Sequence, residues 1–211
     1  MEYMFTLSAE TIYWIAFAVP SILIASTVHE YSHALAAYKL GDATAKAEGR
    51  LTLNPLTHID PLGALCMVLF RFGWSKPVPI NEYNFERREL GTALTALAGP
   101  TSNILMALLV GLIHLIFQPD MDSIFGSFLF TFALINVALA SFNLLPIPPL
   151  DGHKIVRAIL PKGLRYYWEK LEKFSIVLII LMIIPILPQG SIASIFISTI
   201  ISKSLALLGL L

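Results

Sequence analysis

Two histidines and a glutamate stand together in the run HEYSH at residues 29–33. Residues four apart share one face of a helix, so the imidazoles of His29 and His33 can both reach one metal ion. Glu30 would lie beside the open coordination position, as the general base. Because a catalytic zinc ion takes three protein ligands and a water, this spacing predicts one zinc ion per chain. The alternative is a helix end with ordinary solvated polar residues.

A third metal ligand is required, and Asp151 is the candidate that the sequence places best. It follows an apolar stretch, and Pro148 and Pro149 before it end a helix and can turn the backbone inward. The histidine pair also stands at the end of an apolar stretch, on the same predicted side. We therefore expect Asp151 to complete the site. The alternative is an Asp-Gly turn that only leaves the apolar stretch.

The composition of the 211 residues indicates that a lipid bilayer surrounds these elements. Hydrophobic residues make up 56% and charged residues only 13%, whereas soluble domains have about 25% charged residues. The formal net charge is +0, which gives no reason to expect a nucleic-acid partner. The lone cysteine, Cys66, excludes an internal disulfide framework. The sequence predicts an integral membrane protein, and excludes a disordered chain, a secreted mini-scaffold and a soluble enzyme.

Five apolar stretches are candidates for membrane segments. The first has 18 residues, or about 27 Å of helix, close to the thickness of the hydrocarbon layer. The fifth could span the membrane or lie on its surface. We expect an all-α polytopic membrane protein with about 4–6 membrane segments, formed as a single domain over 1–211 with a core at 11–160 and C-terminal helices at 174–210. The five stretches are 11–28, 92–117, 125–145, 174–187 and 192–210.

The basic residues indicate the orientation in the membrane. Seven of the fourteen Lys and Arg residues lie between Lys39 and Arg88, and six more lie between Lys154 and Lys173. Cytoplasmic loops of membrane proteins carry an excess of these residues. We therefore expect a multi-pass protein of the cell (inner or plasma) membrane, with its N-terminus outside and its active site toward the cytoplasmic face.

The connection from 41 to 91 predicts a small cytoplasmic-side β element between the first two core helices. Apolar and polar residues alternate from Ala45 to Asn54, as in a half-buried strand. The segment from Lys76 to Asn81 contains two prolines, which restrict it to an edge strand or a polyproline-like segment. Residues 62–70 are apolar but too short to span, and are expected to form a re-entrant or interfacial piece.

Four motifs together resemble the site-2 protease family of intramembrane zinc metalloproteases. They are HEYSH at 29–33, RLTLNPLTHIDPLG at 50–63, AGPTSN at 98–103 and NLLPIPPLDG at 143–152. The resemblance covers residues 20–160. It implies zinc held by His29, His33 and Asp151, Glu30 as general base, and Asn143 as a group that steadies the tetrahedral intermediate.

The implied activity is hydrolysis of peptide bonds in or near transmembrane segments of a membrane-anchored protein substrate, in regulated intramembrane proteolysis. His153 stands where the family often has a second glycine, and the chain has no room for the peptide-binding PDZ insert that many members carry. A prenyl-protein protease would need a glutamate as third ligand, and Glu169 and Glu172 lie on the solvent side. The remaining alternative is a non-proteolytic metal-binding membrane transporter or scaffold.

Other polar residues suggest weaker hypotheses. Asn103 and Asn136 lie in apolar stretches, where hydrogen bonds between helices are the simpler interpretation. His58 and Asp60 could form a second metal site or outer contacts of the first, but a role in fixing their loop is simpler. His153 could join the nearby ligand or be a surface histidine. Finally, we expect the substrate to be cut as an extended strand paired with the strand at 45–54.

Overall fold

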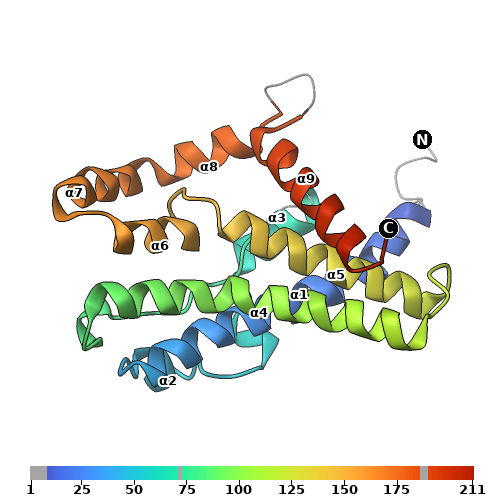
Figure 1. The fold of residues 1–211 in the computed structure, drawn as a ribbon, viewed down its shortest axis with the longest axis horizontal. Helices are drawn as coiled ribbons and strands as arrows, with labels where there is room; N and C mark the ends of the chain where they lie inside the picture. Colours follow the sequence, from blue (N-terminus) through green and yellow to red (C-terminus); the bar gives the residue numbers. More distant parts are fainter. Residues whose placement is uncertain (1–8, 71–72, 186–189) are drawn as a thin grey trace.

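The computed structural model describes residues 9–70, 73–185 and 190–211, and these form a helical protein (Figure 1). Three short 3-10 turns connect the helices, at Pro55–Thr57, Glu82–Asn84 and Leu171–Phe174. The helices are α1 (Ala9–Lys39), α2 (Thr44–Ala47), α3 (Pro61–Phe70), α4 (Arg88–Phe117), α5 (Ile124–Asn143), α6 (Asp151–Ile159), α7 (Lys162–Lys170), α8 (Ser175–Ile183) and α9 (Ile192–Leu207). The predicted all-α class is confirmed.

The long helices α1, α4 and α5 pack against one another and form the centre of the molecule (Figure 1). Small residues at the contacts, such as the fully buried Ala25 of α1, whose carbonyl accepts from Asn103 of α4, let the helix backbones approach closely. The helix α9 packs on α5, and α6 packs on α4. Large apolar side chains cover much of the outer surface, as in a protein surrounded by lipid.

Among the described residues, α4 and α5 are each long and apolar enough to cross a membrane, by length and composition. The 31 residues of α1 extend over about 46 Å, which also exceeds the hydrocarbon thickness. The C-terminal helices are shorter, with 9 residues in α8 and 16 in α9. Part of the predicted stretch 174–187 lies outside the described residues. The number of 4–6 membrane segments therefore stays a prediction.

The predicted β element is wrong for the part of the chain that the structure describes. In this connection the described residues form no strand, and an isolated antiparallel bridge joins Ile59 to Ser75. The residues expected to begin the first strand form α2 instead, which ends before Gly49 at a φ of +69°. The buried residues are Ala45 and Arg50, which are five apart and so do not follow the period of two. Local hydrogen bonding, with Asp42 accepting from the Thr44 N–H at 3.1 Å, replaces strand pairing here.

The segment from Lys76 to Asn81 passes close to α1 without forming a strand. Its Lys76 N–H donates to the carbonyl of His58 at 2.8 Å, and its Asn81 N–H donates to Asp42 at 2.8 Å. The two prolines have no N–H to donate. Loop contacts rather than a sheet therefore hold this segment beside the HEYSH motif.

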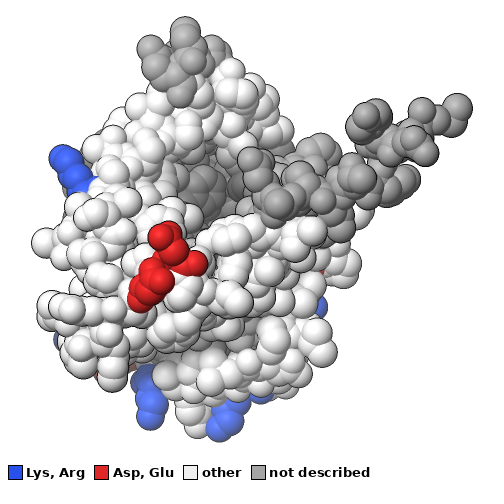
Figure 2. Space-filling view, turned by 90° about the vertical axis from the view of Figure 1, so that its right-hand side faces the viewer, with Lys and Arg blue, Asp and Glu red and all other residues white. Residues whose placement is uncertain are grey.

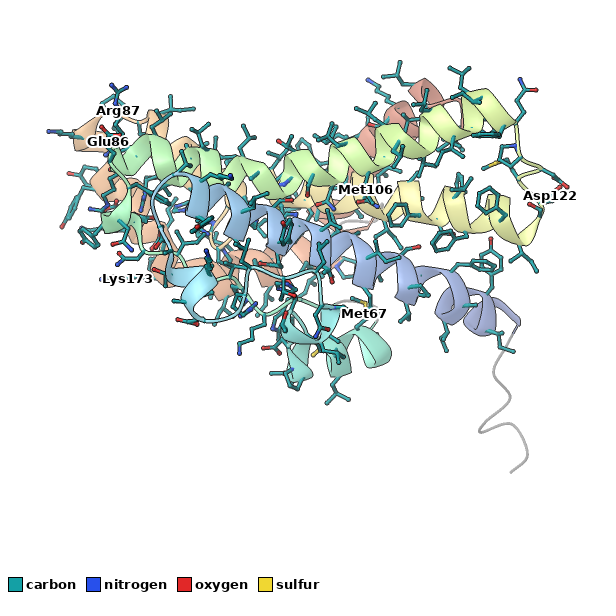
Figure 3. All side chains as sticks on the ribbon, turned by 90° about the horizontal axis from the view of Figure 1, so that it is seen from below. Met67, Glu86, Arg87, Met106, Asp122 and Lys173 are labelled. Carbon is teal, nitrogen blue, oxygen red and sulfur yellow. The ribbon has the colours of Figure 1, made fainter. Side chains whose placement is uncertain are left out.

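The two ends of the helical bundle differ in charge. Arg87, before α4, and Lys173, before α8, lie at one end, and Asp122 lies at the other (Figure 3). Figure 2 looks onto the second end, where a small acidic group stands among uncharged side chains. The turn between α4 and α5 contributes the exposed Asp120 and Asp122 there. The two basic connections thus share one end of the molecule, as expected if both lie on the same side of a membrane.

Candidate metal centre

The HEYSH motif lies inside α1, and its two histidines face the neighbouring helices. Both imidazoles are buried, and their rings meet edge to face with centroids 4.6 Å apart. The Nε2 atoms of His29 and His33 are 3.0 Å from each other. The spacing of four residues therefore brings the two Nε2 atoms close enough to bind one metal ion, as the sequence predicts.

Asp151 is the first residue of α6, and its carboxylate meets the two histidines. The Oδ2 atom lies 3.2 Å from the Nε2 atom of His29 and 3.2 Å from that of His33. A close contact between Gly152 and the turn after α5 makes this approach possible, since a Cβ at Gly152 would collide with the carbonyls of Leu144 and Leu145. His29, His33 and Asp151 form a buried group that is positioned to hold a metal ion.

The spacing of the three ligand atoms fits zinc. Around a tetrahedral zinc ion with bonds of about 2.1 Å, neighbouring ligand atoms are about 3.4 Å apart. The three separations here, 3.0, 3.2 and 3.2 Å, are close to that value. In addition, Asp151 Oδ2 is buried and has no hydrogen-bond donor of normal geometry. Buried acceptors almost always have a partner, so a group of such atoms facing one another calls for a cation.

Gly99 of α4 leaves the space in which such an ion would sit. A Cβ at this position would lie 2.6 Å from the Nε2 atom of His29 and even closer to that of His33. Real Cβ atoms do not approach other heavy atoms so closely. The absence of a side chain at Gly99 therefore keeps the ligand atoms of both histidines open on one side.

The other ring nitrogen of each histidine faces a hydrogen-bond acceptor. His33 Nδ1 lies 2.7 Å from the backbone carbonyl of Thr95, and His29 Nδ1 lies 2.6 Å from Oδ1 of Asn103. Both acceptors belong to α4. A neutral imidazole carries one proton, so a proton on Nδ1 leaves the Nε2 lone pair free to bind a metal.

Glu30 follows His29 directly and lies beside the group rather than in it. Its Oε1 accepts a hydrogen bond of 2.5 Å from the Ser75 hydroxyl, and its Oε2 accepts one of 3.2 Å from the Val78 N–H. The carboxylate is buried, and these two donors hold it in a fixed orientation. A carboxylate fixed next to a metal position can accept the proton of an attacking water.

Asn143 is the last residue of α5, and its side chain bonds within its own helix. The amide donates to the carbonyl of Leu139 at 3.0 Å. No hydrogen bond joins Asn143 to the three candidate ligands among the described residues. Its suggested role at the reacting carbonyl would require the side chain to turn away from Leu139, and stays a prediction.

The other histidines have local roles. His58 is buried, donates to the Thr52 carbonyl at 2.9 Å and accepts from Arg50 at 3.4 Å, which fixes the loop. Asp60 accepts from the Gly63 N–H at 2.8 Å and so caps α3. His153 stacks on Trp168 with ring centroids 5.2 Å apart. The simpler interpretation of His58 and Asp60, which fix their loop, agrees with the structure. His153 is only 1% exposed, so the expected surface histidine is wrong, and it is not among the residues of the candidate metal group.

An ion pair fixes the helix that carries Asp151. The Arg157 side chain of α6 donates to Glu82 at 2.7 Å, in the turn before α4. Burial raises the pKa of the Glu82 carboxyl, but the hydrogen bonds and charges of Arg157 and Arg88 outweigh burial and leave that pKa below its usual value. The carboxylate therefore stays ionised at neutral pH and holds α6 against the loop.

Sequence patterns alone could not reveal several of these contacts. Ser75 and Val78 lie more than forty residues from Glu30, and nothing in their local sequence points to a carboxylate. Thr95 contributes a backbone carbonyl, which any residue has. Gly99 and Asn103, in contrast, stand in a motif that the sequence singled out, AGPTSN at 98–103.

Known proteins resemble this chain over most of its length. A family model described as "Peptidase family M50" matches residues 103–187. "Putative zinc metalloprotease YwhC" of Bacillus subtilis is 38% identical over 186 residues, which cover 83% of this chain and 82% of that protein. "Putative zinc metalloprotease Rip2" of Mycolicibacterium smegmatis is 30% identical over 173 residues, or 78% of this chain and 66% of that protein. No solved structure matches the chain.

Proposed function

Because the chain belongs to peptidase family M50, the site-2 protease family of zinc metalloproteases, we propose that it hydrolyses peptide bonds in or near the transmembrane segments of membrane-anchored proteins. The family supports a zinc-dependent protease with a protein substrate. Cleavage within the membrane, as part of regulated intramembrane proteolysis, is the further step of the proposal. It draws on the apolar helices α4 and α5, which pack against α1, the helix that carries His29 and His33.

One observation carries the assignment of residues, namely the meeting of His29, His33 and Asp151 at separations of 3.0–3.2 Å. We assign these three as the zinc ligands of a single membrane-embedded domain. Bound zinc would supply Lewis acidity, which polarises a carbonyl and lowers the pKa of a water to about 7.

Glu30 is assigned as the general base. It takes a proton from the attacking water and later passes it to the leaving amine, so that it is regenerated in each turnover. The donors from Ser75 and Val78 keep its carboxylate from rotating away. Asn143 is assigned as a group that steadies the tetrahedral intermediate, after release of its bond to Leu139.

The substrate must be unwound before it is cut. In a helix the scissile carbonyl is hydrogen-bonded and covered by side chains, and in lipid each freed backbone group needs a new partner. The strand that was expected to supply this partner, at 45–54, does not exist in the structure. The segment from Lys76 to Asn81 remains beside Glu30 through its Val78 N–H. It is the part of the loop that an extended substrate would meet first.

We expect purified protein to contain one zinc ion per chain. Alanine at His29, His33 or Asp151 removes one of three ligands, so each variant should lose most of its zinc. Metal analysis by mass spectrometry after dialysis measures this, and His153→Ala serves as a control because His153 stacks on Trp168 away from the group. Full zinc content in Asp151→Ala would show that the third ligand lies elsewhere.

We propose that both basic connections face the cytoplasm, because Arg87 and Lys173 share one end of the molecule (Figure 3). In a chain with Cys66 replaced, single cysteines at Arg88 and Lys162 should react only with reagents that enter the cell. A cysteine at Asp122 should react with impermeant reagents. Labelling at Lys162 from outside would contradict this orientation.

A further inference from the structure

Two buried asparagines form a chain of hydrogen bonds that runs from His29 in the candidate metal centre to helix α5. Asn103 of α4 and Asn136 of α5 are both 0% exposed, in helices that are largely apolar. A buried amide costs free energy unless its donors and acceptor are all paired. We infer that Asn103 and Asn136 are positioning residues that hold His29 in the tautomer able to bind zinc.

The orientation of Asn136 is determined by its own helix. Its amide nitrogen donates to the backbone carbonyl of Phe132 at 2.8 Å. A carbonyl can only accept, so the NH₂ group must be on that side. The Oδ1 atom of Asn136 must therefore face α4, where it accepts from Asn103 Nδ2 at 2.9 Å.

The orientation of Asn103 follows from that of Asn136. Its NH₂ group donates to Asn136 Oδ1 and, at 3.2 Å, to the carbonyl of Ala25 in α1. Rotating this amide by 180° would place its oxygen against two other oxygens. Its Oδ1 atom consequently faces His29 Nδ1 at 2.6 Å and can only accept a hydrogen bond from it.

The last step concerns His29 itself. Facing an obligatory acceptor, Nδ1 must carry the imidazole proton, and Nε2 then presents its lone pair to His33 and Asp151. Ala25 and His29 lie one turn apart on the same face of α1. Asn103 therefore bonds to the backbone carbonyl of Ala25 and to the imidazole ring of His29 at the same time. The hydrogen bonds from Asn136 through Asn103 to His29 thus fix the rotation of the imidazole ring and keep its proton on Nδ1.

The two histidines differ in a way that makes this inference testable. His33 relies on a backbone carbonyl, that of Thr95, which substitution does not remove. His29 relies on the side chain of Asn103 and, through it, on that of Asn136, which substitution does remove. Replacing a group that orients a metal-bound histidine lowers metal affinity about 10- to 100-fold.

The experiment measures zinc binding by zinc-free protein in detergent, by competition with a chelator of known affinity. Asn103→Leu keeps the number and branching of the side-chain heavy atoms but removes the acceptor, and we expect zinc affinity to fall about 10- to 100-fold. Asn136→Leu leaves the Asn103 NH₂ group with the Ala25 carbonyl as acceptor and keeps Asn103 Oδ1 against His29, so a smaller loss is expected. Asn103→Asp keeps an acceptor for Nδ1–H but sets its second oxygen against Asn136 Oδ1 and the Ala25 carbonyl, so it should bind zinc more tightly than Asn103→Leu and less tightly than the unchanged chain.

Ser141→Ala is the matched control, because Ser141 is a buried polar residue of α5 whose hydroxyl donates to the Val137 carbonyl in its own helix. The melting temperature of each zinc-free variant separates lost metal affinity from a damaged fold. Unchanged zinc affinity in Asn103→Leu, or equal losses in Asn103→Leu and Asn103→Asp, would overturn the inference. This experiment needs no substrate. A chain that binds zinc as described but cuts no protein would therefore refute the proposed function and leave this inference intact.

Discussion

Replacing Gly99 with alanine is expected to abolish zinc binding, although Gly99 contributes no ligand atom. The added Cβ would stand 2.6 Å from His29 Nε2 and closer still to His33 Nε2, in the space on which both lone pairs converge. To remove this clash, α4 would have to move away from α1. That movement would break the hydrogen bonds of the two rings to Thr95 and Asn103 of α4. Zinc affinity should fall by at least about 100-fold, the upper end of the losses seen when contacts around ligands are disturbed.

Gly163→Ala provides the control for this experiment. Gly163 also lies in a helix, α7, and a Cβ there meets nothing within 4 Å. Both variants should fold, so zinc content and affinity, measured by chelator competition, are compared at equal helical content by circular dichroism. Normal zinc binding by Gly99→Ala would mean that the ion sits on another side of the histidine pair.

The sequence predicts the candidate site better than it predicts the loop around it. The HEYSH spacing identifies two residues that meet because helix geometry is regular and local. Asp151, 118 residues after His33, is located by a different argument, since apolar stretches and basic loops place it at the same end. The structure brings its carboxylate to 3.2 Å from both histidines.

The loop could not be predicted in the same way. Period-two alternation from Ala45 to Asn54 is typical of a strand, but a strand needs a partner, and the available donors are taken by side chains and loop carbonyls. Arg50 is the clearest example, because it is buried to donate to the Lys76 carbonyl at 2.7 Å. Such long-range polar contacts leave no periodic signal in the sequence.

Replacing Glu30 with glutamine is expected to abolish proteolysis while zinc stays bound. An amide cannot take a proton from water, and loss of general-base assistance lowers the rate about 10²- to 10⁴-fold. The surrounding contacts should survive, because an amide oxygen can still accept from the Val78 N–H and an amide nitrogen can donate to the Ser75 hydroxyl. Turnover is measured with a membrane-anchored substrate in detergent or liposomes, and the cleavage products are identified by mass spectrometry.

Glu48→Gln is the control, because Glu48 is an exposed glutamate directly after α2, and this variant should cleave substrate at the normal rate. Zinc content must be measured in parallel, since inactivity accompanied by lost zinc would reflect the metal site and not the base. A zinc-loaded Glu30→Gln protein that still cuts substrate would remove Glu30 from the mechanism. A zinc-loaded but inactive one would distinguish a hydrolase from a transporter or scaffold, because only hydrolysis requires a base that accepts the proton of the attacking water.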